Sequence, residues 1–145
     1  MRRPDMAKLK LDLDPDPEVT VIGISSHVND YRLCWSLNRS MGLELSRCNG
    51  DITEEVQGRT TRFTVFSHEE PGQEGRYLLV NNHGSDGVLI RDQRQADYFL
   101  VVDNALAERD PDLIDRVRRS EFVLTAFPLP FERIRTGHKL LSDLT

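Results

Sequence analysis

Hydrophobic residues recur at every second position along much of this chain, a spacing that is typical of β-strands with one buried face. Leucines alternate with polar residues from Leu9 to Leu13 and predict a first strand, which ends by Pro15 because proline cannot donate to a sheet. Five further stretches, rich in apolar or β-branched residues, predict strands at 19–24, 43–48, 59–66, 76–80 and 98–102. The last of these is the most apolar and is expected at the centre of the sheet. The polar stretches 49–58 and 81–87 are expected to be connections.

A helix is predicted between Asn29 and Gly42, because asparagine is a good N-cap and glycine a good C-terminal stop. Its apolar residues fall three and four positions apart and therefore share one face, formed by Leu33, Cys34, Leu37 and Met41. Tyr31 and Trp35 lie on a neighbouring face and are expected to widen this apolar stripe.

A second helix is predicted over 111–119, with Asp110 as its N-cap and Pro111 at its first position. The following stretch 122–127 is either a strand or a continuation of that helix, and its apolar, β-branched character favours the strand. These elements predict a single α+β domain, in which an antiparallel sheet of about five or six strands carries the two helices. We expect residues 1–7 to be disordered and residues 128–145 to form a loosely docked tail.

The composition is that of an ordinary globular domain, with 145 residues, 38% hydrophobic and 30% charged. The formal net charge of −5 argues against a protein that coats nucleic acid with its whole surface. No apolar run approaches the roughly 18 residues of a membrane span, and the charged start of the chain is not followed by the apolar stretch of a signal peptide. A cytoplasmic location without membrane association is therefore expected.

The residues that carry chemistry do not assemble into a catalytic or metal-binding motif. Cys34 and Cys48 are the only cysteines, and Cys34 sits in the helical apolar pattern, where a small buried side chain is expected. The four histidines are scattered, without metal-ligand spacing. His83, Ser85 and Asp86 share one loop, but catalytic triads are built from separate segments. We therefore expect no catalytic residue, no metal and no cofactor.

Basic residues gather in the last third of the chain. Between positions 116 and 139 they outnumber the acidic residues and form a candidate patch for a phosphate backbone, made of Arg116, Arg118, Arg119, Arg133, Arg135 and Lys139. The arginines near the end of the second predicted helix also match its dipole, so solvation and capping explain them without a ligand.

The stretch from Ile90 to Tyr98 resembles the signature of the small bacterial IPExxxVDY family. Ile90, Asp97 and Tyr98 match that pattern, whereas its Pro, Glu and Val are replaced by Arg91, Asp92 and Ala96. The order of a leading strand, a helix that begins Asp-Tyr-Arg-Leu, the motif and a late Thr-Ala-Phe extends the resemblance over residues 8–141. The family has no assigned activity, so the resemblance implies a compact cytosolic protein and no particular chemistry.

The motif has two physical interpretations. In the first it shapes the start of a buried strand: Ile90 anchors the incoming loop, Asp92 and Asp97 accept backbone N–H groups, and Tyr98 buries its ring with its hydroxyl bonded. In the second, Asp92, Asp97 and Tyr98 line a small-molecule pocket with neighbouring arginines.

Three function hypotheses follow from these observations. The leading one is a non-catalytic protein-interaction or self-association module, for which a homodimer that forms through an edge strand or through the exposed side of the helix layer is the candidate assembly. The second is a nucleic-acid-binding protein that uses the basic patch, and this is the partner we expect least. The third is a small-molecule site at Asp92, Asp97 and Tyr98.

Overall fold

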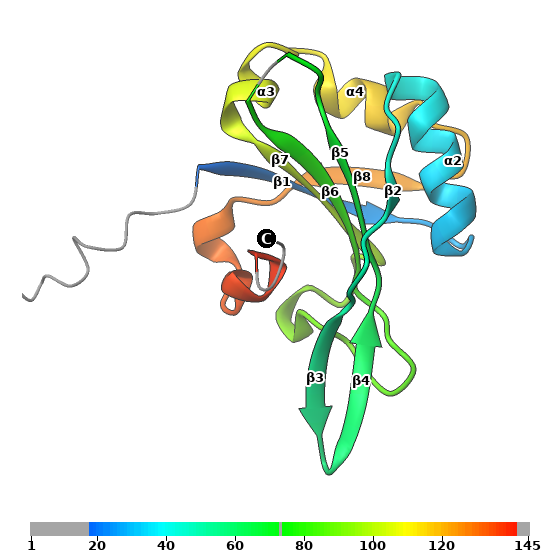
Figure 1. Ribbon diagram of the computed structural model, residues 1–145, viewed down its shortest axis with the longest axis vertical. Helices are drawn as coiled ribbons and strands as arrows, with labels where there is room; N and C mark the ends of the chain where they lie inside the picture. The colour runs from blue at the N-terminus through cyan, green and yellow to red at the C-terminus, as the bar shows by residue number, and fades with distance from the viewer. Residues whose placement is uncertain (1–17, 73, 142–145) are drawn as a thin grey trace, which may run out of the picture.

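The computed structural model describes residues 18–72 and 74–141. The strands are Val19–Ser25 (β1), Ser46–Arg47 (β2), Ile52–Val56 (β3), Arg59–Phe63 (β4), Val65–Glu69 (β5), Arg76–Asn81 (β6), Tyr98–Asp103 (β7) and Thr125–Pro128 (β8). The α-helices are Asp30–Met41 (α2), Asn104–Glu108 (α3) and Leu113–Arg118 (α4), and three 3-10 turns cover Arg91–Gln93 (η2), Phe131–Arg133 (η3) and Gly137–Leu141 (η4). The predicted α+β fold is confirmed (Figure 1).

Six strands form one antiparallel sheet in the order β2-β5-β6-β7-β1-β8. As predicted, β7 lies inside this sheet, where Leu100 faces Leu79 of β6 on one side and Ile22 of β1 on the other. All its residues from Tyr98 to Val102 are buried. A continuous apolar run is therefore explained by a strand that has neighbours on both sides and layers on both faces.

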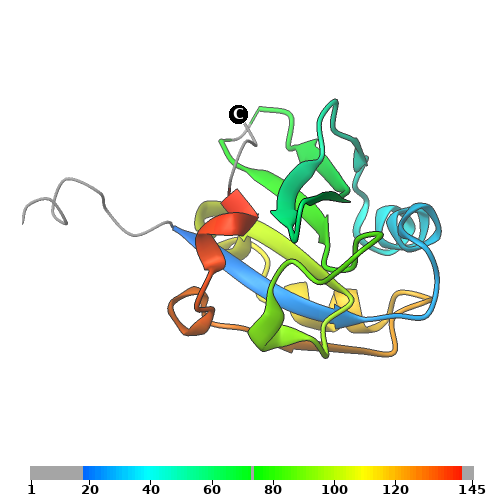
Figure 2. The ribbon, with the colours of Figure 1, turned by 90° about the horizontal axis from the view of Figure 1, so that it is seen from below.

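Alternate residues of the sheet belong to two separate cores. Leu100 and Leu79 point toward the face that α2, α3 and α4 cover, together with Leu33 and Val117 from those helices. Phe99 points the other way, into a core closed by the loop around Ile90 and by the C-terminal turns. Figure 2 shows the helices and the C-terminal segment on opposite sides of the sheet.

Helix α2 forms as predicted. The Asn29 side chain accepts a 3.0 Å hydrogen bond from the backbone N–H of Arg32, and Gly42 ends the helix with a positive φ of 67°. The predicted apolar face is buried at Leu33, Cys34, Leu37 and Met41. The expectation for Tyr31 and Trp35 is wrong, since they are 59% and 49% exposed. Each ring packs on one side only, Tyr31 edge-on against Phe66 at 5.4 Å and Trp35 against Phe122 at 6.5 Å between centroids, and its other side faces solvent.

The stretch 49–58 is not a simple connection. It contains β3, which pairs with β4 in a hairpin closed by Gln57 and Gly58, both with positive φ. The predicted strand 59–66 is divided at Thr64 into β4, in the hairpin, and β5, in the main sheet. The hairpin projects beyond the rest of the molecule (Figure 1), and although its base at Ile52 and Phe63 reaches the second core, most of its other side chains are polar.

Three other elements differ from the prediction at their ends. The predicted strand 43–48 shrinks to Ser46–Arg47, because the backbone of Leu45 bonds to the side chain of Asn38. The predicted helix 111–119 begins only at Leu113. Before it lies a turn in which the N–H of Leu113 donates a hydrogen bond to the carbonyl of Asp110. The stretch 122–127 is a strand only from Thr125, and the preceding residues form a turn.

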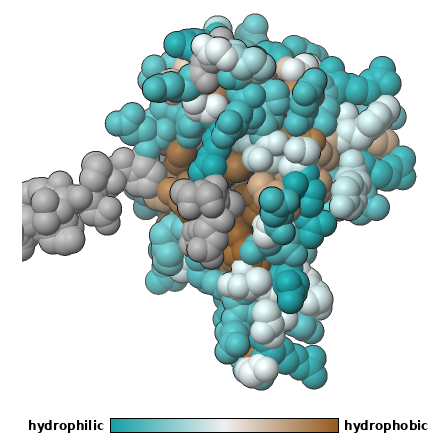
Figure 3. All heavy atoms as spheres, viewed as in Figure 1, coloured by the Kyte–Doolittle hydropathy of each residue, from teal (hydrophilic) through white to brown (hydrophobic). Residues whose placement is uncertain are grey.

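The C-terminal segment docks more closely than predicted. Leu129, Ile134 and Leu140 are all buried in the second core. In Figure 3 hydrophobic residues are visible at the centre of this face, whereas the projecting hairpin is mostly hydrophilic. The predicted strand at 9–13, the disorder expected for 1–7 and the last four residues lie outside the described residues. Among the described helices, none has both the length and the apolarity to cross a membrane.

Candidate functional site

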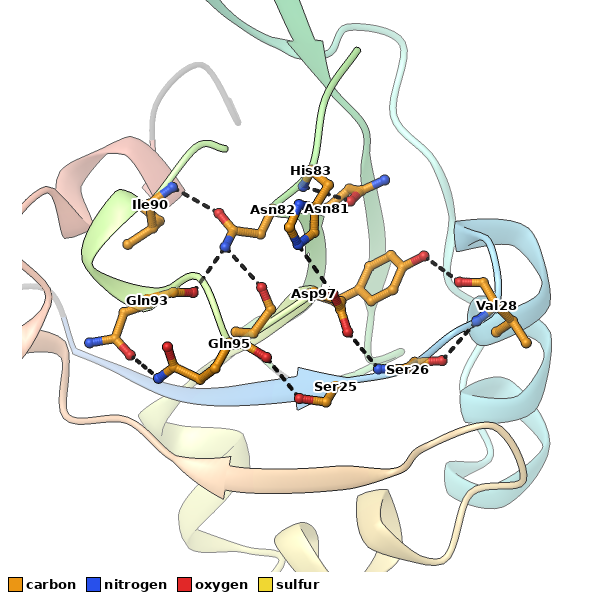
Figure 4. Close-up of polar contacts among 12 residues, drawn as sticks. Ser25, Ser26, Val28, Asn81, Asn82, His83, Ile90, Gln93, Gln95 and Asp97 are labelled. Carbon is orange, nitrogen blue, oxygen red and sulfur yellow. Dashed lines mark hydrogen bonds and ion pairs between the residues drawn. The ribbon is translucent and has the colours of Figure 1, made fainter. Parts of the chain in front are cut away.

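A buried asparagine organises the loop that leads to β7. Asn82 is fully buried, and its side-chain oxygen accepts a 2.8 Å hydrogen bond from the N–H of Ile90. Its amide nitrogen donates to the carbonyls of Gln93, at 3.1 Å, and Ala96, at 2.9 Å (Figure 4). One side chain thus satisfies three backbone groups of the loop and closes it. The sequence offered no signal for this role, because an asparagine in a polar stretch is typical of an exposed turn.

Asp97 joins the start of β7 to the segment between β1 and α2. One carboxylate oxygen accepts a 2.9 Å hydrogen bond from the N–H of Ser26, and the other lies 3.1 Å from Nε2 of His83 (Figure 4). The backbone of Asp97 is also bonded on both sides, through its N–H to Ile24 and through its carbonyl to the N–H of Asn82. The carboxylate is therefore used inside the fold, as the first interpretation of the motif expects.

Tyr98 is buried under α2. Its ring belongs to the core on the helix side, and its hydroxyl donates a 2.8 Å hydrogen bond to the carbonyl of Val28. Burial, reinforced by the carboxylates of Asp30 and Asp97, raises the pKa of the Tyr98 hydroxyl. The hydroxyl therefore stays protonated at neutral pH and serves to fix the segment that precedes the helix.

The other two motif residues lie on the opposite side of the sheet. Ile90 is fully buried in the second core, and Asp92 is exposed and accepts a 3.3 Å hydrogen bond from the N–H of Arg135 in the C-terminal segment. Because Tyr98 points into the helix-side core, the structure does not bring Asp92 and Tyr98 to one pocket. The geometry favours the architectural interpretation of the motif.

The six predicted basic-patch residues are divided between the two faces. Arg116, Arg118 and Arg119 belong to α4 or its end, on the helix side, whereas Arg133, Arg135 and Lys139 belong to the C-terminal turns on the other side. Three of the six have partners within the fold. Arg116 binds Asp110, Arg118 donates to the carbonyl of Ala126, and Lys139 lies 2.9 Å from Glu54 of the hairpin. Closeness in sequence therefore does not produce one continuous patch.

A polar depression of about 270 Å³ opens beside the end of α2. Its charged and hydroxyl-bearing lining residues are Glu70, Tyr77, Arg109, Asp110 and Arg116. Arg116 donates hydrogen bonds of 2.6 Å to Asp110 and 2.7 Å to the carbonyl of Met41, which hold its guanidinium in place. Burial and the carboxylates of Glu70 and Asp110 raise the pKa of Tyr77. Acidic and basic groups alternate around this depression, so it favours neither anions nor cations.

The cysteine chemistry is as expected from the helical pattern. Cys34 is buried, and its thiol donates a 3.4 Å hydrogen bond to the carbonyl of Leu45. Burial, with a contribution from Asp30, raises the pKa of this thiol to about 11. A thiolate nucleophile is thereby disfavoured at neutral pH. Among the described residues, no group of three or more His, Cys, Asp or Glu side chains could hold a metal ion.

The most unusual surface lies on the outer side of α2, and we call it the α2 surface: Tyr31, Arg32, Trp35, Arg39, Glu121 and Phe122. Tyr31, Trp35 and Leu124 are the exposed large hydrophobic residues of the described chain, and each is about half accessible or more. Trp35 lies against Phe122, with ring centroids 6.5 Å apart. A depression of about 350 Å³ opens among Tyr31, Arg32, Trp35, Glu121 and Phe122.

Arginines stack on the rings of the α2 surface. The guanidinium carbon of Arg32 lies 4.6 Å from the centroid of Phe122, and that of Arg39 lies 4.9 Å from the centroid of Trp35. Both distances fit cation–π contacts, which keep the arginines close to the rings while their donors still face solvent. The surface therefore offers flat apolar rings and guanidinium donors side by side, with one carboxylate, Glu121.

Side chains obstruct both edges of the main sheet, at Leu45 beside β2 and at Ala126 in β8. At the β2 edge, Asn38 binds both the N–H and the carbonyl of Leu45, and only two residues follow in the strand. At the β8 edge, Arg118 binds the carbonyl of Ala126, and Pro128 has no N–H to donate. These contacts obstruct the addition of a further strand. Of the two modes of self-association considered from the sequence, pairing of edge strands is therefore disfavoured relative to contact through the helix layer.

The molecule was compared with known proteins at three levels. Family models, curated proteins and solved structures all give no match to this chain.

Proposed function

We propose that this protein is a non-catalytic interaction module that associates with a second copy of itself through the α2 surface. The single observation that carries the proposal is the exposure of Tyr31 and Trp35 beside Phe122, on an otherwise well-buried fold. Tryptophan, tyrosine and arginine contribute most of the binding energy at protein interfaces. A cluster of all three types, held by a capped helix, is therefore suited to binding a protein chain.

The charge distribution supports a second copy as the partner. The α2 surface carries Arg32 and Arg39 against one carboxylate, Glu121, whereas the whole chain has a formal net charge of −5. Other parts of an identical chain are therefore electrostatically complementary to this surface. The obstructed edges of the main sheet support the helix layer over strand pairing.

The non-catalytic part of the proposal rests on how the motif residues are used. The carboxylate of Asp97 bonds to Ser26 and His83, and the hydroxyl of Tyr98 bonds to Val28. Groups engaged in this way hold the chain together and are not presented to a substrate.

Sedimentation velocity of the full chain between 1 and about 100 μM tests the proposal. We expect a concentration-dependent monomer–dimer equilibrium, and Trp35→Ala should weaken it at least about 30-fold, the effect of removing a side chain worth about 2 kcal/mol. Arg39→Glu should also weaken it. The matched control is Arg133→Glu, which reverses an exposed charge on the opposite face of the sheet.

A parent chain that stays monomeric over this range would overturn the proposal, as would equal dimerisation by Trp35→Ala. Stacked rings and guanidinium groups can also bind single-stranded nucleic acid. A titration with a single-stranded oligonucleotide at low salt is therefore run in parallel. Tight, salt-sensitive binding that Trp35→Ala removes would contradict the assignment of this surface to protein.

We also propose membership in the IPExxxVDY family and a cytoplasmic location. Ile90, Asp97 and Tyr98 support the first, because Ile90 and Tyr98 are buried and Asp97 bonds across to Ser26 and His83. The composition supports the second.

A further inference from the structure

We infer that the α2 surface binds the segment Leu9–Glu18 of a second copy of this chain. This inference rests on the proposed function and names the part of the partner that occupies the surface. It follows from the composition of that segment, from the place where it joins the described fold, and from the groups that the surface presents.

The composition of the segment complements the α2 surface. Between Leu9 and Glu18 the chain has three leucines, four acidic residues and one lysine. The leucines alternate with polar residues, so in an extended chain they share one side and can cover the exposed rings. The carboxylates match Arg32 and Arg39, whose long side chains lie on those rings. One segment therefore meets both chemical requirements of the surface.

The position of β1 keeps the three leucines from covering the α2 surface of their own molecule together. Both Figure 1 and Figure 2 show that the end of β1 at Val19 lies on one side of the molecule and α2 on the other. The seven residues of β1 span about 20 Å, since a strand rises about 3.3 Å per residue. The extended chain is at most about 20 Å long from Leu13 to Val19 and about 33 Å from Leu9 to Val19. Turning back along β1 uses the whole reach of Leu13 and most of that of Leu9, so the three leucines cannot together cover the α2 surface of their own molecule, whereas a neighbouring copy has no such limit.

Trp35 gives a direct measurement, because it is the single tryptophan of the chain. The acceptor is the full chain carrying Leu9→Ser, Leu11→Ser and Leu13→Ser, and the probe is a synthetic peptide of residues 7–18. We expect the peptide to shift the emission of Trp35 to shorter wavelength in a saturable manner. The control peptide carries the same three serine substitutions and should cause no shift.

Charge exchange tests the partner assignment in the full-length protein. Arg32→Glu with Arg39→Glu should weaken dimerisation at least tenfold in sedimentation velocity. Adding Asp12→Arg and Asp14→Arg to the same chain should restore at least half of that loss, because every copy then presents the exchanged charges on both parts. Circular dichroism and thermal melting of each variant establish that the fold is kept.

The outcomes separate this inference from the proposed function. If the leucine-to-serine chain dimerises like the parent while Trp35→Ala does not, the α2 surface is an interface but Leu9–Glu18 is not its occupant. If the peptide leaves Trp35 emission unchanged, or if the charge exchange restores nothing, the inference is also overturned. The parent could also be strictly monomeric and still show Trp35 emission at shorter wavelength than the leucine-to-serine chain. That result would place the segment on its own molecule and would contradict binding between copies.

Discussion

The carboxylate of Asp97 accepts a 2.9 Å hydrogen bond from the backbone N–H of Ser26, a residue 71 positions earlier in the chain. Ser26 follows β1 directly and precedes α2, so this bond connects the start of the central strand β7 with the segment that sets the direction of the helix. His83 holds the other carboxylate oxygen. The most chemically suggestive carboxylate of the motif therefore positions the helix that carries the exposed aromatic residues.

Asp97→Asn should lower stability without unfolding the protein. The amide keeps one acceptor oxygen and replaces the other by an NH₂ group, so one of the contacts with Ser26 and His83 is lost. A hydrogen bond to a charged group contributes about 1.5–3 kcal/mol, and we expect a loss of about 1–2 kcal/mol in urea unfolding. Asp92→Asn is the control, because the exposed Asp92 makes one long bond. Equal stability of the parent and Asp97→Asn would contradict the structural role.

Asn82→Ala should cost more than any exposed substitution in the same loop. It leaves the N–H of Ile90 and the carbonyl of Ala96 without their side-chain partner in a buried place, while the carbonyl of Gln93 keeps only the N–H of Ala96. Unsatisfied buried polar groups cost about 1–3 kcal/mol each, partly relieved by local movement, so we expect a loss of about 2–4 kcal/mol. Asn81→Ala, which removes a single acceptor for the N–H of His83, should cost less than about 1 kcal/mol. Thermal melts of both variants decide the comparison.

Two aspartates introduced on opposite faces of α2 should have opposite consequences. Leu37→Asp places a carboxylate in the helix-side core, where an unpaired buried charge costs several kcal/mol, and the domain should unfold. Trp35→Asp places the same group on the outer face, two residues away, and should leave a cooperative melt within a few degrees of the parent. A native-like melt for Leu37→Asp, followed by near-ultraviolet circular dichroism, would refute the placement of the helix.

The two cysteines should react differently with Ellman's reagent at pH 8. Cys48 is partly accessible and should be labelled in the native protein, whereas Cys34 should react only on unfolding, because burial raises its pKa to about 11. Two rapidly labelled thiols in the native state would contradict the burial of Cys34.

The same pKa shift predicts a loss of stability in alkali. The Cys34 thiol has an ordinary pKa of 9.0 and a folded value of about 11. Above pH 9 the unfolded chain loses this proton first, so folding becomes less favourable until about pH 11, by at most about 3 kcal/mol. Urea unfolding at pH 8, 10 and 11 should show a steeper decline for the parent than for Cys34→Ala, in which this contribution is absent. Parallel declines would show that Cys34 does not titrate in this way.

The sequence predicted most accurately those segments in which burial and capping residues all indicate the same element. The strand β7 was predictable because both of its faces are buried, which leaves only apolar residues between Tyr98 and Val102. Helix α2 was predictable because its cap residues and its buried face all agree. The hairpin strand β3 was missed because only its first residue, Ile52, reaches the second core, and the next three positions, 53–55, are polar.

The errors at the candidate sites have a common physical cause. Apolar spacing shows that Trp35 could be buried, but whether a neighbouring layer covers that face depends on the rest of the fold. Closeness in sequence likewise could not reveal that Arg119 and Arg133 lie on opposite faces. Asn82, in contrast, is a polar residue that is buried. Its three backbone partners come together only in the folded loop, so the sequence could not indicate its burial.

The closed edges of the main sheet also bear on how this protein behaves at high concentration. Open strand edges are the templates on which partly unfolded copies stack into fibrils. Here Asn38 occupies the backbone beside β2, and Arg118 with Pro128 does so at β8. A reciprocal exchange in which the Leu9–Glu18 segment of each copy fills the α2 surface of the other is, in contrast, satisfied after two molecules have met. Growth is therefore expected to stop at a finite particle, which makes concentrated solutions clear and reversible on dilution rather than prone to polymer formation.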